Sequence, residues 1–118
     1  MKPVISKEAF DEVRILRWRG AQHPTYQTIV KQMEQEGIRP YAYTHGPNAR
    51  LAVRSHGYSK VMYCVEGALE VVFPDLNQRV VLRPGDRLNI PRGVRYAGVV
   101  SIQGVRCVEG ETPVGLLS

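Results

Sequence analysis

Cysteines, long apolar runs and signal-type leaders are scarce or missing in this sequence. Cys64 and Cys107 are its only cysteines, too few for a disulfide scaffold. No stretch approaches the roughly 20 apolar residues of a membrane-spanning helix, and no apolar run of signal-peptide length opens the chain. We therefore expect a cytoplasmic protein that does not associate with membranes, with both cysteines reduced and buried.

Several widespread catalytic motifs are missing as well. The chain contains no GKS or GKT phosphate loop, no GxGxxG, no HExxH and no CxxC pair. With 118 residues it has room for one domain, which excludes an enzyme built from separate cofactor and substrate modules.

Acidic residues are outnumbered, with 11 Asp and Glu against 16 Lys and Arg and a net charge of +5. This excess attracts anions in general and does not identify one. Basic and aromatic residues alternate in two places, a pattern that can bind single-stranded nucleic acid by charge and stacking. Its members are Arg14, Arg17, Trp18, Arg19, Arg39, Tyr41 and Tyr43. Because the other basic residues are dispersed and no nucleic-acid motif is present, nucleic-acid binding is the weaker alternative.

The 11 glycines and 8 prolines predict many short elements, as in an all-β fold. One helix is predicted over 25–36, with one apolar face formed by Tyr26, Ile29, Val30 and Met33. Thr25 suits its N-cap and Gly37 the position after its end. Strands are predicted at 13–19, 61–65, 68–73, 80–82, 88–90, 99–100 and 105–108.

Residues 61–65 are apolar at every position, so both faces of that strand need cover. A barrel interior covers one face. A second sheet, the helix or another subunit must cover the other, and for this reason we expect a homodimer.

Two segments carry a family resemblance. The first, RSHGYSKVMYCVEG at 54–67, ends in aromatic-x-x-Glu-Gly; the second, GDRLNIPRGVRY at 85–96, matches G-D-x-x-x-x-P-x-G at Gly85, Asp86, Pro91 and Gly93. Together they resemble the two motifs of the cupin superfamily, in particular small cupin-2-like proteins. The resemblance covers about 41–110 and implies a double-stranded β-helix, or jelly-roll barrel, with a central pocket. It implies one domain over 1–118, with a strand and helix in 1–40, the barrel core in 41–110 and a tail at 111–118.

The same resemblance places the metal-ligand positions of cupins on Arg54, His56, Lys60 and Tyr96. Only His56 is a usual ligand, and two cations at one site would repel a divalent ion. We therefore predict no metal or other cofactor. A metal-dependent cupin enzyme, dioxygenase-like or isomerase-like, with an atypical ligand set that includes His56, is the alternative.

Arg54, His56, Tyr58 and Lys60 have the same parity and share one face if the strand is continuous. With Tyr96 opposite, they would give a pocket with a cationic mouth, two phenols and an apolar floor. Because arginine and lysine suit carboxylate or phosphate, we predict a small anionic ligand bound by Arg54, His56, Tyr58, Lys60 and Tyr96. Acid–base catalysis by Lys60, or by His56 with Tyr96, is also open, so the sequence does not decide whether the protein is an enzyme.

Overall fold

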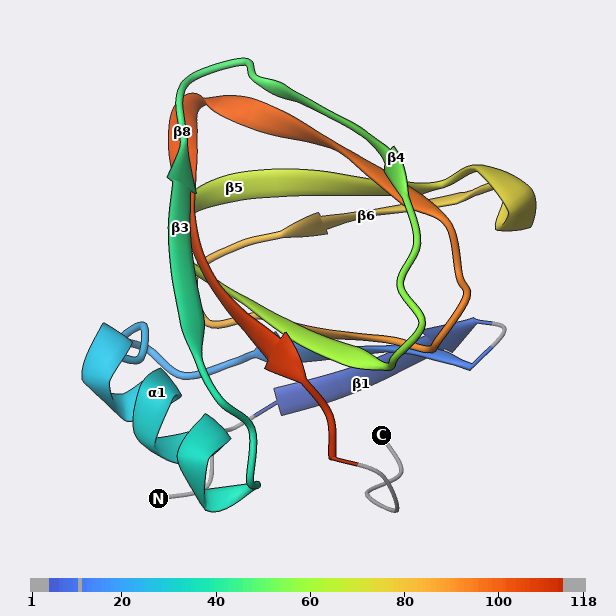
Figure 1. The fold of residues 1–118 in the computed structure, drawn as a ribbon. Coiled ribbons are helices and arrows are strands. Elements are labelled where there is room, and N and C mark those ends of the chain that lie inside the picture. Colours follow the sequence, from blue (N-terminus) through green and yellow to red (C-terminus); the bar gives the residue numbers. More distant parts are fainter. Residues whose placement is uncertain (1–4, 11, 114–118) are drawn as a thin grey trace.

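The computed structural model describes residues 5–10 and 12–113 of the chain (Figure 1). Eight strands and one α-helix make up this part of the chain. They are β1 (Ile5–Phe10), β2 (Val13–Trp18), α1 (Tyr26–Gln35), β3 (Tyr41–His45), β4 (Arg50–Arg54), β5 (Lys60–Phe73), β6 (Gln78–Leu82), β7 (Arg87–Ile90) and β8 (Tyr96–Glu111), with a short 3-10 turn at Pro74–Leu76 between β5 and β6. None of the described helical residues form a segment long and apolar enough to cross a membrane.

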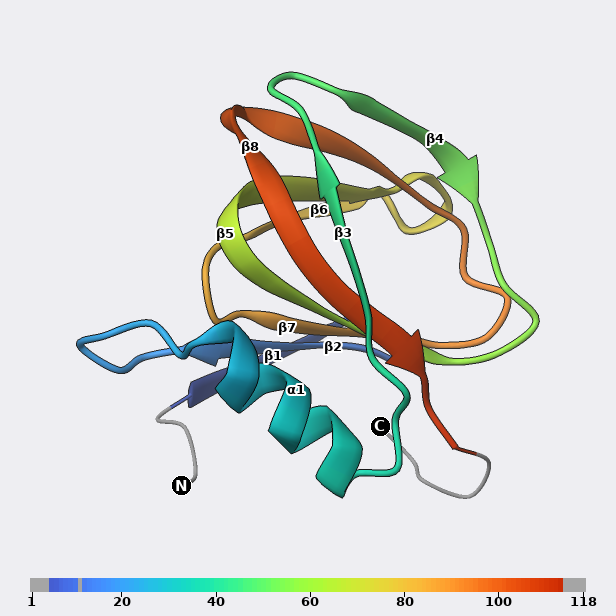
Figure 2. The same ribbon diagram turned by 60° about the vertical axis from the view of Figure 1, so that its left-hand side comes forward.

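Two long strands, β5 and β8, pair with each other and organise the sheet. The first part of β5 also pairs with β7, and its last part pairs with β6. In the same way β8 pairs with β4 near its start and with β3 near its end. The strands therefore curl into the barrel seen in Figures 1 and 2, which confirms the predicted all-β class.

The separate strands predicted at 61–65 and 68–73 are one strand, and so are those at 99–100 and 105–108. The register of β5 against β8 shifts on both sides of Glu66 and Gly67. Such irregularities bend a strand without ending it. The glycines at these bends resemble turn signals in the sequence, which explains the misplaced breaks.

The main core fills the barrel and includes Phe73, Leu82 and Leu88. Val13 and Ile15 of β2 belong to it as well, because β2 pairs with β7. The strand predicted at 13–19 is therefore confirmed, but the barrel core is not confined to 41–110. Strand β1 pairs with β2 and was not foreseen; of the predicted tail, 114–118 lie outside the described residues.

Helix α1 matches the predicted helix and covers the outer face of β5. The Thr25 hydroxyl accepts a hydrogen bond from the Thr28 backbone N–H, and Gly37 follows with φ of +76°. Ile29 and Met33 pack in a second cluster with Val61, Tyr63 and Val65 of β5. This contact lies within the chain, so it removes the reason for expecting a dimer; the homodimer itself stays a prediction.

Asp86 ties the turn before β7 to strand β2. Its carboxylate accepts hydrogen bonds from the backbone N–H of Arg83 at 3.0 Å and of Trp18 at 2.9 Å, and it pairs with Arg17 at 2.8 Å. An aspartate at a turn can bond local backbone N–H groups, and Asp86 does so here with Arg83. The long-range bond to Trp18 is an addition that fixes β2 in place.

We predict that Gly67→Ala strongly destabilises the protein. Gly67 has φ of +75°, and a Cβ there would lie 2.0 Å from the carbonyl oxygen of Gly104. Backbone strain alone should cost about 1–3 kcal/mol, and the clash adds to it. Urea unfolding measures the loss. Gly57→Ala is the matched control, because Gly57 has open space around it, and its free energy of unfolding should change by less than about 0.5 kcal/mol. Equal effects of the two changes would contradict this account of the bend.

Candidate functional site

A pocket of about 210 Å³ opens between β3, β4, β5 and β8. We call it the barrel pocket. Its walls combine apolar side chains, aromatic rings and three charged groups. The lining residues are Tyr41, Tyr43, His45, Leu51, Ala52, Arg54, Lys60, Met62, Leu69, Val71, Tyr96, Ala97, Gly98 and Glu109.

Lys60 lies at the centre of the polar groups and is only 3 % exposed. Its Nζ atom is 2.6 Å from Oε2 of Glu109 and donates to the Tyr96 hydroxyl at 2.7 Å. Burial disfavours the charge, but the hydrogen bonds to Glu109 and Tyr96 outweigh it and raise the pKa of Lys60. Lys60 is therefore a fixed, buried cation at neutral pH.

Tyr96 connects Lys60 to His56. Because the Tyr96 oxygen accepts the lysine hydrogen bond, its own proton is free to bond Nε2 of His56, 2.7 Å away. This assigns the imidazole proton to Nδ1 and makes His56 neutral. Burial and the nearby Lys60 charge lower the pKa of His56, which agrees with this assignment. Burial raises the pKa of Tyr96 against the opposing effect of Lys60, so the phenol stays protonated.

Glu109 was missed by the sequence reasoning, although it completes the network. It lies on β8 directly opposite Met62 of β5, and its carboxylate also bonds the hydroxyl of Tyr43. Burial, followed by the charge of its neighbours, raises the pKa of Tyr43, so this hydroxyl is a donor. Glu109 shares parity with Val105 and Cys107, which are both buried. An acidic residue on the inward face of a strand was the signal that could have found it.

The five predicted site residues are only partly brought together. His56, Lys60 and Tyr96 are in contact, and Arg54 lines the mouth with an exposed side chain. Neither His56 nor Tyr58 is among the residues that line the barrel pocket, and their rings pack on each other at 5.0 Å between centroids. Strand β4 ends at Arg54 and β5 begins at Lys60, so the predicted common parity does not extend through 55–59.

The predicted cationic mouth needs a correction. Lys60 is buried and neutralised by Glu109, so it adds no net charge to the pocket. Arg54 donates through Nε to the Ala52 carbonyl oxygen at 3.5 Å, and no carboxylate among the described residues pairs with it. The excess positive charge at the barrel pocket is therefore that of Arg54.

The donor set does not suit a divalent metal. Among the described residues, no three His, Cys, Asp or Glu side chains are grouped so that they could hold one. The groups that converge here, His56, Tyr96 and Glu109, all face the ammonium of Lys60. A second cation in this place would be repelled by the first. As arranged, these residues do not form a metal site.

Comparison with known proteins supports the fold. No protein-family model and no curated protein sequence matches the chain. RmlC from Streptococcus suis, solved in complex with dTDP-D-xylose, is similar with a TM-score of 0.65 and 11% identity over 97% of this chain and 72% of that one. A DUF861 family protein from Thermotoga maritima has a TM-score of 0.55 and 21% identity, covering 84% and 98%. A cupin-2 domain containing protein from Shewanella frigidimarina has a TM-score of 0.52 and 14% identity, covering 95% and 80%.

These neighbours and the strand pairing define the class of this protein as a small jelly-roll barrel. More narrowly, the chain has the cupin fold, as its two motifs predicted. At such low identities the similarity establishes architecture alone, and the chemistry has to come from the residues of this chain.

We predict that Lys60→Met destabilises the protein by about 3 kcal/mol, because Glu109 would keep a largely buried, unpaired charge. The double change Lys60→Met with Glu109→Gln should recover most of that loss, since it removes both charges. Chemical denaturation of Lys60→Met, Glu109→Gln, the double variant and the wild type measures the coupling. Additive effects, with no recovery in the double variant, would contradict a buried ion pair.

We also predict that the free energy of unfolding falls as the pH is lowered from about 7.5 to about 5.5, in part through His56. The pKa of His56 is lower in the folded state than in the unfolded chain. Below the unfolded value, the unfolded chain therefore binds more protons and is favoured. His56→Gln keeps an acceptor for Tyr96 and should show a smaller loss over the same interval. An unchanged pH dependence in this variant would contradict the neutral His56.

Proposed function

We propose that the barrel pocket binds a small organic monoanion, a carboxylate with an apolar or aromatic body. The observation on which this depends is the charge balance of the lining. Lys60 and Glu109 compensate each other, whereas Arg54 has no carboxylate partner among the described residues. A guanidinium at a pocket mouth matches one carboxylate through two parallel hydrogen bonds.

The rest of the lining supports an apolar body for this ligand. Met62, Leu69 and Val71 line the pocket with aliphatic side chains. On β3 a row of rings follows the strand, with centroids 6.1 Å apart between Tyr41 and Tyr43. The volume of about 210 Å³ is below the roughly 300–1,000 Å³ common for drug-sized ligands, which favours a molecule of one ring or a short chain.

The alternatives have less support. A metal-dependent enzyme would need metal-ligating side chains that are not already bonded to the Lys60 ammonium. Single-strand binding would use Arg17 and Trp18, but Arg17 is paired with Asp86, and the Trp18 indole N–H donates to the Gln22 carbonyl oxygen. Arg17 is therefore not available as a free basic group, which single-strand binding through charge and stacking together would need.

Benzoate is a suitable probe, measured by isothermal titration calorimetry. Arg54→Gln should raise its dissociation constant about tenfold, because the charge-assisted pair is lost. Arg50→Gln is the matched control: Arg50 is exposed on the same strand but does not line the pocket, so its removal should leave the affinity unchanged. Equal effects of both changes, or no binding of benzoate, cyclohexanecarboxylate and hexanoate by the wild type, would overturn the proposal.

A further inference from the structure

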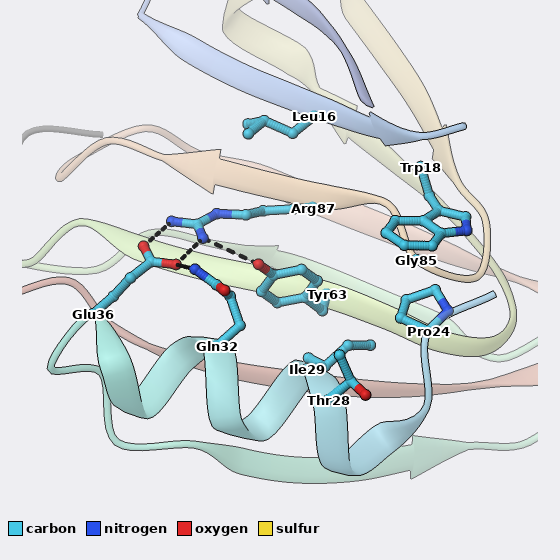
Figure 3. A pocket seen from close by; sticks show the side chains of 10 residues that line it. All are labelled: Leu16, Trp18, Pro24, Thr28, Ile29, Gln32, Glu36, Tyr63, Gly85 and Arg87. Atoms are coloured by element: carbon cyan, nitrogen blue, oxygen red, sulfur yellow. Dashed lines mark hydrogen bonds and ion pairs between the residues drawn. The ribbon is translucent and has the colours of Figure 1, made fainter. Parts of the chain in front are cut away.

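We propose that a second pocket, on the outer face of the sheet beneath α1, binds an uncharged molecule containing an apolar ring. We call it the helix pocket; its volume is about 320 Å³. None of its lining residues belongs to the barrel pocket. They are Leu16, Trp18, Pro24, Thr28, Ile29, Gln32, Glu36, Tyr63, Gly85 and Arg87, drawn in Figure 3.

The pocket exists because the helix seals only part of the outer face. Ile29 and Met33 pack on Val61, Tyr63 and Val65. Val13 and Ile15 point to one face of β2, and Leu16 and Trp18 point to the opposite face. Leu16 and Trp18 belong to neither core cluster. Figure 3 shows them across the pocket from the helix. Two apolar side chains thus face a cavity.

Trp18 forms a fixed wall. Its Nε1 donates to the Gln22 carbonyl oxygen at 2.7 Å. The side chain lies so close to Gly85 that a Cβ there would be 2.7 Å from Trp18 Cβ and Cγ, and Gly85 has φ of +93°. A Cβ on Gly20 would likewise lie 2.8 Å from the indole. The two glycines leave room for the indole and the hydrogen bond holds it, so the ring is preorganised as a wall of the pocket.

The opposite end of the helix pocket is polar but electrically balanced. Arg87 donates to both Glu36 oxygens, at 2.7 and 2.8 Å, and to the Tyr63 hydroxyl at 3.1 Å (Figure 3). Its Nε donates to Asn89 at 2.9 Å. The side-chain hydrogen bond to Glu36 helps to hold the pKa of Arg87 above its ordinary value despite burial. With the guanidinium nitrogens engaged and the charges paired, nothing here favours an ionic ligand.

Two groups remain to orient a neutral ligand. Gln32 donates to Glu36 through Nε2 at 2.9 Å, and its amide oxygen has no partner among the described residues. The Thr28 hydroxyl, also at the pocket, bonds that of Thr25 and no other side chain among the described residues. A ring between Trp18 and Ile29 with a hydroxyl or N–H near Gln32 would satisfy the apolar walls and the open acceptor. An aromatic alcohol is the simplest such molecule.

The test uses benzyl alcohol, the uncharged counterpart of benzoate. Trp18 is the only tryptophan of the chain and lines the helix pocket, so its fluorescence reports on this site directly. We expect a saturable change in Trp18 fluorescence on titration with benzyl alcohol. Benzoate should bind to this pocket at least about tenfold more weakly. Thr28→Phe should fill the pocket and abolish the response. Gln27→Phe places the same ring on an exposed helix position outside the lining and should leave it intact.

A further variant distinguishes the two binding proposals. Arg54→Gln should weaken benzoate binding in the barrel pocket and leave the fluorescence titration with benzyl alcohol unchanged, so either proposal can fail alone. No saturable response in the wild type would overturn the helix pocket as a ligand site. The proposal would also be overturned if Thr28→Phe raised the melting temperature but left the fluorescence response to benzyl alcohol unchanged. The cavity filled by the phenylalanine would then be only a packing gap.

Discussion

Burial of β5 on both faces is the constraint on which the rest of the molecule depends. Residues 60–65 are all buried: Met62 faces the barrel, whereas Val61 and Tyr63 face outward under α1. An amphipathic helix of 10 residues is too short to be stable alone, so its contact with β5 stabilises both elements. The same strand therefore separates two pockets, with Met62 lining one and Tyr63 the other.

The position of Lys60 at the start of this strand determines the electrostatics of the interior. Its ammonium is attached to the backbone and faces a histidine, a phenol and a carboxylate. A tethered cation cannot dissociate. Its charge adds to burial in lowering the pKa of His56, and its hydrogen bond to the Tyr96 oxygen leaves the phenol proton for Nε2 of His56. Buried ion pairs contribute little to net stability, so this one is better understood as preorganising the pocket.

Local patterns predicted local structure. The helix cap at Thr25, the strand at 13–18 and the Asp86 turn follow from spacing and from residues with one strong preference. The long strand β5 was divided because Gly67, which allows a bend, looks like a turn. The parity of Glu109 indicates an inward carboxylate, but its partner could not be identified, because Lys60 is distant in sequence and the pairing of β5 with β8 leaves no local trace. Tyr58 was predicted to line the pocket because strand alternation was assumed to continue through 55–59, which lie between β4 and β5.

One charge distinguishes the two pockets. Each pocket contains a basic side chain paired with a glutamate: Lys60 with Glu109 in the barrel pocket, and Arg87 with Glu36 in the helix pocket. Only the barrel pocket has an additional cation, Arg54, at its mouth. The cupin-like turn contributes to the helix pocket, since Asp86 holds the Trp18 backbone while Gly85 leaves room for the indole ring. A motif that determines the architecture of the barrel thus also forms a wall of a pocket outside it.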